Sequence, residues 1–160
     1  MQLVTISLVV TVVTLCVAVL LFGFGEFSSN LLTGDVINYG FFEVCTMNIC
    51  AKNTLSISLM LTVIGFIFAL HSVLFSITSL LLQNRIGDDL FKFLLVVLVY
   101  NVLAITFMTA GWNELRLYFI DTKTQDSTGW SYKLLISGFS FNVIAIVPIV
   151  FLIFKAYKKN

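Results

Sequence analysis

The cysteines are the residues of this sequence whose type and spacing most directly suggest chemistry. Four residues separate Cys45 from Cys50, a spacing that suits the two arms of a short hairpin. In an extracellular segment we expect such a pair to form a disulfide. Zinc is a poor alternative, because a structural zinc site takes four ligands and the remaining Cys and His both lie in long apolar runs. One of these is Cys16, which we expect to be a small apolar residue with a free thiol.

Three polar side chains inside the apolar runs could also carry chemistry. His71 is the only histidine, and an ionisable group at membrane depth is a functional candidate. No acidic residue lies within a predicted span to relay a proton with it, so we expect a neutral histidine that is packed or faces lipid. Asn101 and Asn142 could form a polar site, but hydrogen bonds between helices are the simpler interpretation.

The sequence predicts no catalytic residue, no cofactor and no metal site. The polar residues of the apolar runs are mainly Ser, Thr and Asn with one isolated His, so a nucleophile, a base and an orienting acid cannot be assembled. We find no phosphate-binding glycine loop, and no broken helices with intramembrane charges of the kind that transporters use. We therefore expect a protein that is not an enzyme and does not bind nucleic acid.

Four long apolar runs must position these residues. Only 11% of the 160 residues are charged and 59% are hydrophobic, whereas a soluble domain is roughly 25% charged. Asp, Glu, Lys and Arg are absent from residues 1–25, 53–84, 93–113 and 134–154. Each run can cross a bilayer as a helix, which needs about 20 residues. We predict one domain, residues 1–160, with spans at about 3–23, 55–82, 91–111 and 133–154.

The first run has an alternative interpretation as a cleaved signal peptide, since it begins at Met1 and ends near Gly23 and Gly25. A signal peptide usually has a basic start and an apolar core of roughly 7 to 15 residues. Here only Met1 and Gln2 precede a longer run of apolar and hydroxyl residues, which favours a span that is retained. Four buried helices of a soluble protein are a second alternative, but so short a chain has too little polar surface to cover them.

The charges between the runs predict the orientation in the membrane. The loops at residues 24–54 and 112–132 are net acidic, whereas the short loop after the second run and the C-terminal tail are net basic when counted together. Because Lys and Arg favour the cytoplasmic side, we expect both termini in the cytoplasm and the two longer loops outside. The predicted location is the plasma membrane, and the first partner is the lipid bilayer.

Small residues predict how the spans pack. Lipid tails are as apolar as leucine, so membrane helices associate through close packing and side-chain hydrogen bonds. The second run carries small residues at alternating steps of four and three, namely Ser58, Thr62, Gly65, Ala69, Ser72, Ser76 and Ser79. This period of 3.5 favours a left-handed crossing. The predicted fold is an all-α membrane protein, a left-handed bundle of four transmembrane helices, with a kink at Pro148.

The segment 39–50, YGFFEVCTMNIC, resembles the signature of the claudin superfamily, in which Gly-Leu-Trp precedes two cysteines. Gly40, Phe41 and Phe42 stand where the Gly, Leu and Trp would be, followed by the two cysteines. Later segments, RIGDDLFKF, MTAGWNEL and STGWSYKLLISGFSF, are similar to the branch of peripheral myelin protein and epithelial membrane proteins. The order of four spans and a longer first outer loop is also that of the superfamily.

The resemblance implies a small extracellular antiparallel sheet that caps the bundle, formed by the first outer loop. Three short runs, 24–29, 36–44 and 46–51, are compatible with strands. A disulfide between the two outer cysteines would join two of these strands. The aromatic residues near the outer ends of the third and fourth spans are expected to anchor at the lipid headgroups or to share in a recognition surface; these are Trp112, Trp130 and Tyr132.

Two functions follow from this resemblance and from the lack of a reactive group. The first is a claudin-like role in cell-cell contact or membrane organisation, through extracellular and lateral contacts with itself or another membrane protein. The predicted interface residues are Tyr39, Phe41, Val44, Met47 and Ile49. The alternative is an accessory subunit of an ion channel or receptor complex, with the bundle docked against its partner.

Overall fold

The computed structural model describes residues 2–26, 32–33, 37–39, 43–46, 49–52, 57–86, 90–121, 127–128 and 130–157. Its four helices are α1 (Gln2–Glu26), α2 (Ile57–Ile86), α3 (Leu90–Asp121) and α4 (Trp130–Tyr157). Among the described residues, four helical stretches are long and apolar enough to cross a membrane: Leu3–Glu26, Ile57–Gln83, Leu90–Glu114 and Trp130–Tyr157. The chain is therefore a membrane protein by the length and composition of its helices.

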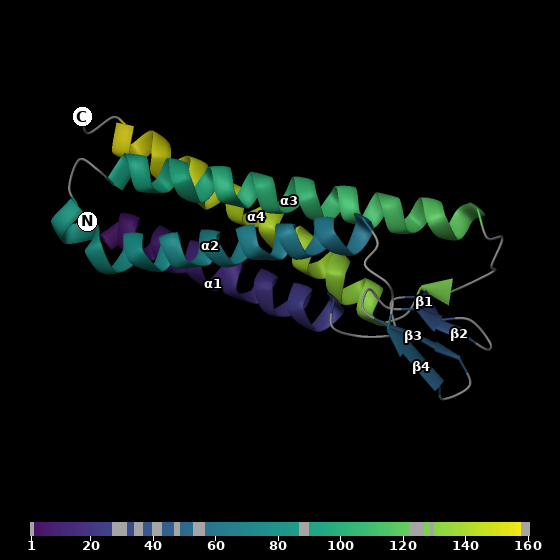
Figure 1. Cartoon of the computed structure of the whole chain (residues 1–160). Helices are drawn as coiled ribbons and strands as arrows, with labels where there is room; N and C mark the ends of the chain where they lie inside the picture. The colour runs from purple at the N-terminus through teal and green to yellow at the C-terminus, as the bar shows by residue number, and fades with distance from the viewer. Residues whose placement is uncertain are drawn as a thin grey trace.

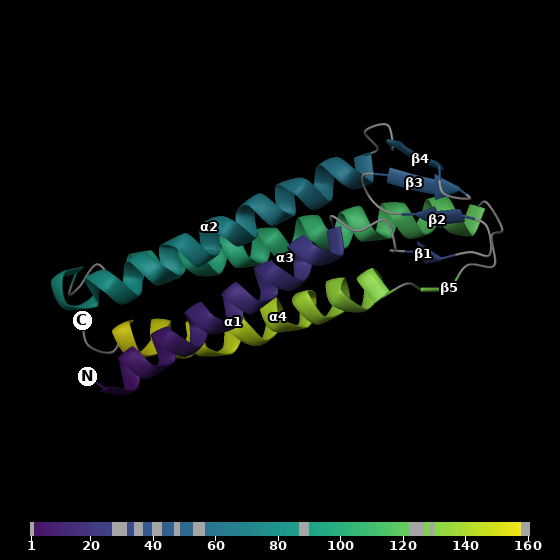
Figure 2. The same ribbon diagram turned by 90° about the horizontal axis from the view of Figure 1, so that it is seen from below.

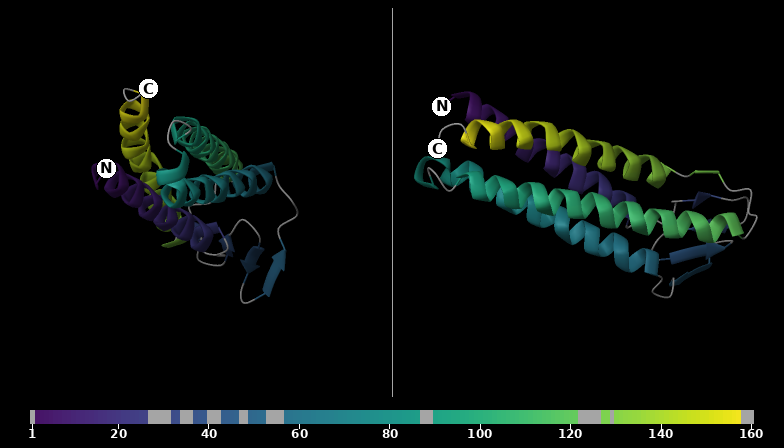
Figure 3. Two further views of the ribbon diagram at one scale, coloured as in Figure 1. Left: turned by 90° about the vertical axis from the view of Figure 1, so that its left-hand side faces the viewer. Right: turned by 90° about the horizontal axis from the view of Figure 1, so that it is seen from above.

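The four helices form an elongated bundle, as predicted (Figure 1). Figure 2 shows α1 beside α4 and α2 beside α3, and these two pairs make the most extensive helix contacts. Both termini lie at one end of the bundle and the strands lie at the other, which the right-hand view of Figure 3 also shows. The left-handed crossing and the kink at Pro148, which lies inside α4, stay predictions.

Three of the four described helices, α1, α3 and α4, extend further toward the strands than the predicted spans. Residues 24–26, which we placed in the outer loop and in a first strand, form the last turn of α1. Helix contact explains this extension, because a Cβ atom at Gly25 would lie only 2.8 Å from Cγ of Leu135 in α4. Likewise α3 continues to Asp121, so the first ten residues of the predicted loop 112–132 are helical.

Five short strands lie at this end of the bundle: β1 (Leu32–Thr33), β2 (Ile37–Tyr39), β3 (Glu43–Thr46), β4 (Ile49–Lys52) and β5 (Ser127–Thr128). They pair in the order β4-β3-β2-β1-β5, and each pair is antiparallel. The run 36–44, which we expected to be one strand, contributes to both β2 and β3. Gly40 lies between them in sequence, and glycine weakens a strand. Because β5 pairs with β1, one sheet joins the connection between α1 and α2 to the connection between α3 and α4.

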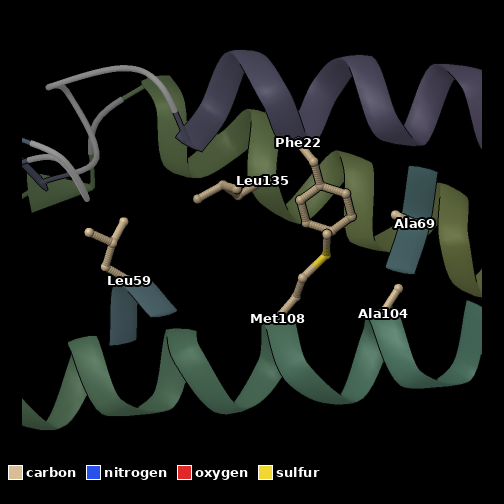
Figure 4. Close-up of a cluster of buried hydrophobic side chains, with 6 residues drawn as sticks. All are labelled: Phe22, Leu59, Ala69, Ala104, Met108 and Leu135. Carbon is tan, nitrogen blue, oxygen red and sulfur yellow. The ribbon is translucent and has the colours of Figure 1, made fainter. Parts of the chain in front are cut away.

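The described part of the bundle interior contains three buried apolar clusters, which follow one another along the length of the bundle. The cluster nearest the sheet consists of Phe22, Leu59, Ala69, Ala104, Met108 and Leu135 (Figure 4). The next two consist of Leu15, Val97, Ala145 and Ile149, and of Leu8, Leu94 and Leu152. All four helices contribute to the first cluster, so it holds together the end of the bundle nearest the sheet.

Candidate functional site

The sheet contains the part of the predicted interface that the structure describes. Ile49 is the first residue of the edge strand β4, and 76% of its surface is exposed. Tyr39 of β2 lies opposite Val44 of β3 in the register of the sheet. The other two predicted interface residues, Phe41 and Met47, lie outside the described residues, as do Gly40 and Phe42 of the signature.

The two outer cysteines lie on neighbouring strands. Cys45 of β3 and Cys50 of β4 are directly opposite each other in the antiparallel register. Cα atoms of opposite residues in such a pair are about 4.5 to 5.5 Å apart, which is within the range that disulfides span. Cys16 in α1 has a free thiol, as predicted. The sheet therefore places opposite each other the two cysteines for which the sequence predicts a disulfide.

The small-residue stripe of α2 lies in the bundle interior, mainly against α3. All seven of its residues are buried, namely Ser58, Thr62, Gly65, Ala69, Ser72, Ser76 and Ser79. Two of the serines donate hydrogen bonds to backbone carbonyls of α3: Ser58 to Gly111 at 2.8 Å, and Ser72 to Val97 at 3.3 Å. Close packing and hydrogen bonds between helices thus occur along one face of α2.

Asn101 and Asn142 meet in the interior between α3 and α4. The side-chain amide of Asn101 donates a hydrogen bond to the backbone carbonyl of Asn142, with 3.0 Å between the heavy atoms. Both side chains are fully buried, and the side chain of Asn142 has no hydrogen-bond partner in the described part of the chain. The contact joins two helices and contains no acid or base, so it fits a packing role.

His71 lies on the outer surface of the bundle, where its ring stacks on Tyr100 of α3 with centroids 5.5 Å apart. Tyr100 also stacks on Phe75 and contacts Phe68, so aromatic rings line this side of α2 and α3. Nδ1 of His71 lies 2.8 Å from the carbonyl oxygen of Ile67. Because a carbonyl only accepts, Nδ1 must carry the hydrogen, and in a neutral ring Nε2 is then an acceptor.

A cavity of about 160 Å³ lies among the four helices near the sheet, and one acidic side chain lines it. This side chain is Glu26, which is only 2% exposed. We did not predict a buried position for Glu26 from the sequence, because we counted it among the charges of the outer loop. One feature of the sequence could have indicated this burial. Glu26 directly follows a charge-free run of 25 residues, where a helix can continue by one more turn.

Among the described residues, no group of three or more His, Cys, Asp and Glu side chains could hold a metal ion. No protein-family model matches the chain, and no curated protein matches its sequence.

Proposed function

We propose that this chain is a claudin-like plasma-membrane protein that acts in cell-cell contact or membrane organisation, through its sheet and through lateral helix contacts. The observation that carries this proposal is the position of Ile49, an apolar side chain that is largely exposed on β4, the edge strand of the sheet in the described part of the chain. An edge strand has unpaired N–H and C=O groups that can bind another strand. Ile49 next to these groups would add apolar contact to such an interface.

The arrangement of the sheet supports a rigid contact surface. This sheet contains strands from the connection between α1 and α2 and from the connection between α3 and α4, and it lies at the end of the bundle opposite the termini (Figure 1). We propose that the termini are cytoplasmic and the sheet is extracellular, as the charges of the loops predict. A disulfide between Cys45 and Cys50 would then join β4 to β3 and hold the edge strand in place before a partner binds.

A second function, that of an accessory subunit of a channel or receptor, is favoured by the surface around His71. This polar ring is exposed within a candidate span, and its neutral form offers an acceptor at Nε2. A transmembrane helix that donates a hydrogen bond could pair with this nitrogen, while its apolar side chains pack on Tyr100 and Phe75. This lateral contact would not need the sheet.

Expression in cells that lack junctions separates the two functions. For the first function, we expect the tagged protein to accumulate where two expressing cells touch, and Ile49→Asp to abolish this accumulation. His71→Leu should leave it unchanged. For the second function, we expect no accumulation at contacts but a changed surface level or gating of a co-expressed channel, sensitive to His71→Leu and insensitive to Ile49→Asp. If the wild-type protein does not accumulate at contacts between the cells that express it, our proposal is contradicted.

A further inference from the structure

The cavity near the sheet is large enough to hold a small ligand. All four helices line it, and its wall includes Phe22, Glu26, Trp112, Tyr132, Leu135 and Phe139. A dry apolar cavity of about 150 Å³ can hold a benzene molecule. A volume of about 160 Å³ thus suits a head group with a few methylene groups, and a longer chain would have to extend out of the cavity.

Glu26 is the acidic residue of a wall that also contains two threonines and is otherwise apolar and aromatic. Its Oε1 atom is fully buried and has no hydrogen-bond partner within the residues that the structure describes. The two threonines of the wall do not supply one, because Thr62 and Thr109 donate to backbone carbonyls of their own helices. Burial of a carboxylate is costly unless an opposite charge or hydrogen-bond donors compensate for it.

We propose that this cavity binds the head group of a cationic amphiphile, with the carboxylate of Glu26 accepting hydrogen bonds from its ammonium group. An ammonium group supplies both the opposite charge and the donors that the carboxylate lacks. Trp112 and Tyr132, whose ring centroids are 4.7 Å apart, add two aromatic rings to the same wall. The face of such a ring attracts a cation at distances within about 6 Å.

The side chains at the rim indicate where the alkyl chain leaves the cavity. Ile136 of α4 lines the cavity and is 44% exposed, and Thr109 of α3 lines it and is half-buried. The cavity therefore reaches the outer surface of the bundle between α3 and α4. That surface lies within candidate spans, so an amphiphile dissolved in the bilayer can enter directly from the lipid. An anion without hydrogen-bond donors would bring nothing that pairs with Oε1 of Glu26, and a fully apolar ligand would also leave this atom unpaired.

The test measures binding of octylammonium to the full chain in nanodiscs of zwitterionic lipid. The chain has two tryptophans, so in a Trp130→Phe background the fluorescence reports on Trp112 in the cavity wall. We expect a saturable fluorescence change with octylammonium, and binding of 1-octanol at least about tenfold weaker, because the alcohol brings no charge to the carboxylate. Equal affinities for the amine and the alcohol would overturn the proposal.

Two variants complete the test. Glu26→Gln removes the charge at nearly constant shape, and we expect it to weaken octylammonium binding at least about tenfold while the affinity for 1-octanol stays the same. Ile136→Phe enlarges a side chain at the exposed rim without adding a second tryptophan, and it should block entry while the helix content by circular dichroism stays unchanged. If Glu26→Gln fails to fold, the rim variant and the comparison with 1-octanol still decide. Wild-type affinity for octylammonium in either folded variant would overturn the proposal.

Discussion

A Cβ atom at Gly65 of α2 would lie 2.6 Å from Cγ of Met108 in α3 and 2.9 Å from the backbone nitrogen of that residue. The flexible Met side chain can move, but the backbone nitrogen cannot. A second close approach lies further along the same two helices, where a Cβ at Gly111 would meet Thr62 Cγ2 at 2.7 Å. The contact between α2 and α3 therefore depends on residues without a large side chain.

We predict that Gly65→Leu and Ala69→Leu destabilise the bundle by about 1 to 3 kcal/mol, since large side chains in a packed interior force the neighbouring helix outward. Leu70→Ala and Leu74→Ala change exposed positions on the other side of α2 and should cost less than about 0.5 kcal/mol. Thermal unfolding in detergent measures all four variants. Equal tolerance of the four changes would contradict the role of the small-residue stripe.

Ser58→Ala should cost about 0.6 kcal/mol and at most about 1.7, which is the range for side-chain hydrogen bonds between membrane helices. The variant loses the 2.8 Å bond from Ser58 to the carbonyl of Gly111. Ser137→Ala is the matched control, because the exposed hydroxyl of Ser137 bonds only within its own helix, to the carbonyl of Lys133. The same unfolding assay compares them, and a larger loss in the control would show that the bond between helices does not stabilise the bundle.

The proposed orientation predicts that an epitope tag after Asn160 is detected only after cells are permeabilised. The basic residues of the tail and of the connection between α2 and α3 favour the cytoplasm. An epitope inserted between α3 and β5 should be detected on intact cells, and it serves as the control for surface expression. Antibody binding to the C-terminal tag on intact cells would contradict the proposed orientation.

The opposite positions of Cys45 and Cys50 predict a disulfide between them in protein from the cell surface. Alkylation without reduction, followed by mass spectrometry, should find the peptides of these two cysteines linked and Cys16 modified as a free thiol. Cys45→Ser alone would leave a second free thiol, at Cys50, and serves as the control. Alkylation of both outer cysteines in the wild-type chain would remove the disulfide from our account.

The spans and the buried face of α2 could be predicted from the sequence because both are local patterns. Charge-free runs mark the hydrocarbon layer, and small residues with a period of 3.5 mark one face of a helix. The pattern could not show that Ser58 and Ser72 would bond to α3, because periodicity identifies a face and not the helix opposite it.

Features that depend on contacts between distant segments could not be predicted. Glu26 is a single charge after an apolar run, and its burial follows from the continuation of α1 against α4, where Gly25 meets Leu135. The strand β5 has two residues, too few for any periodicity, and it exists through its pairing with β1, nearly a hundred residues earlier in the chain. The resemblance to claudins suggested a capping sheet, but it did not predict that residues between α3 and α4 would contribute a strand to it.

The central claim, contact between cells through the sheet, is tested most directly in a mixed culture of cells expressing green-tagged protein, cells expressing red-tagged protein and cells expressing neither. The measured quantity is the green fluorescence at contacts with red cells, divided by that at contacts with non-expressing cells. Green protein comes from one membrane in both cases, so a ratio above one requires binding across the contact.

We predict a ratio clearly above one for the wild-type protein, and a ratio of one when the red protein carries Ile49→Asp. Leu81→Ser in the red protein is the control. Leu81 is 75% exposed, much like Ile49, but it lies in α2 near the end of the helix that is far from the sheet. It should leave the ratio unchanged at equal surface expression. A ratio of one with wild-type protein on both cells would contradict the account.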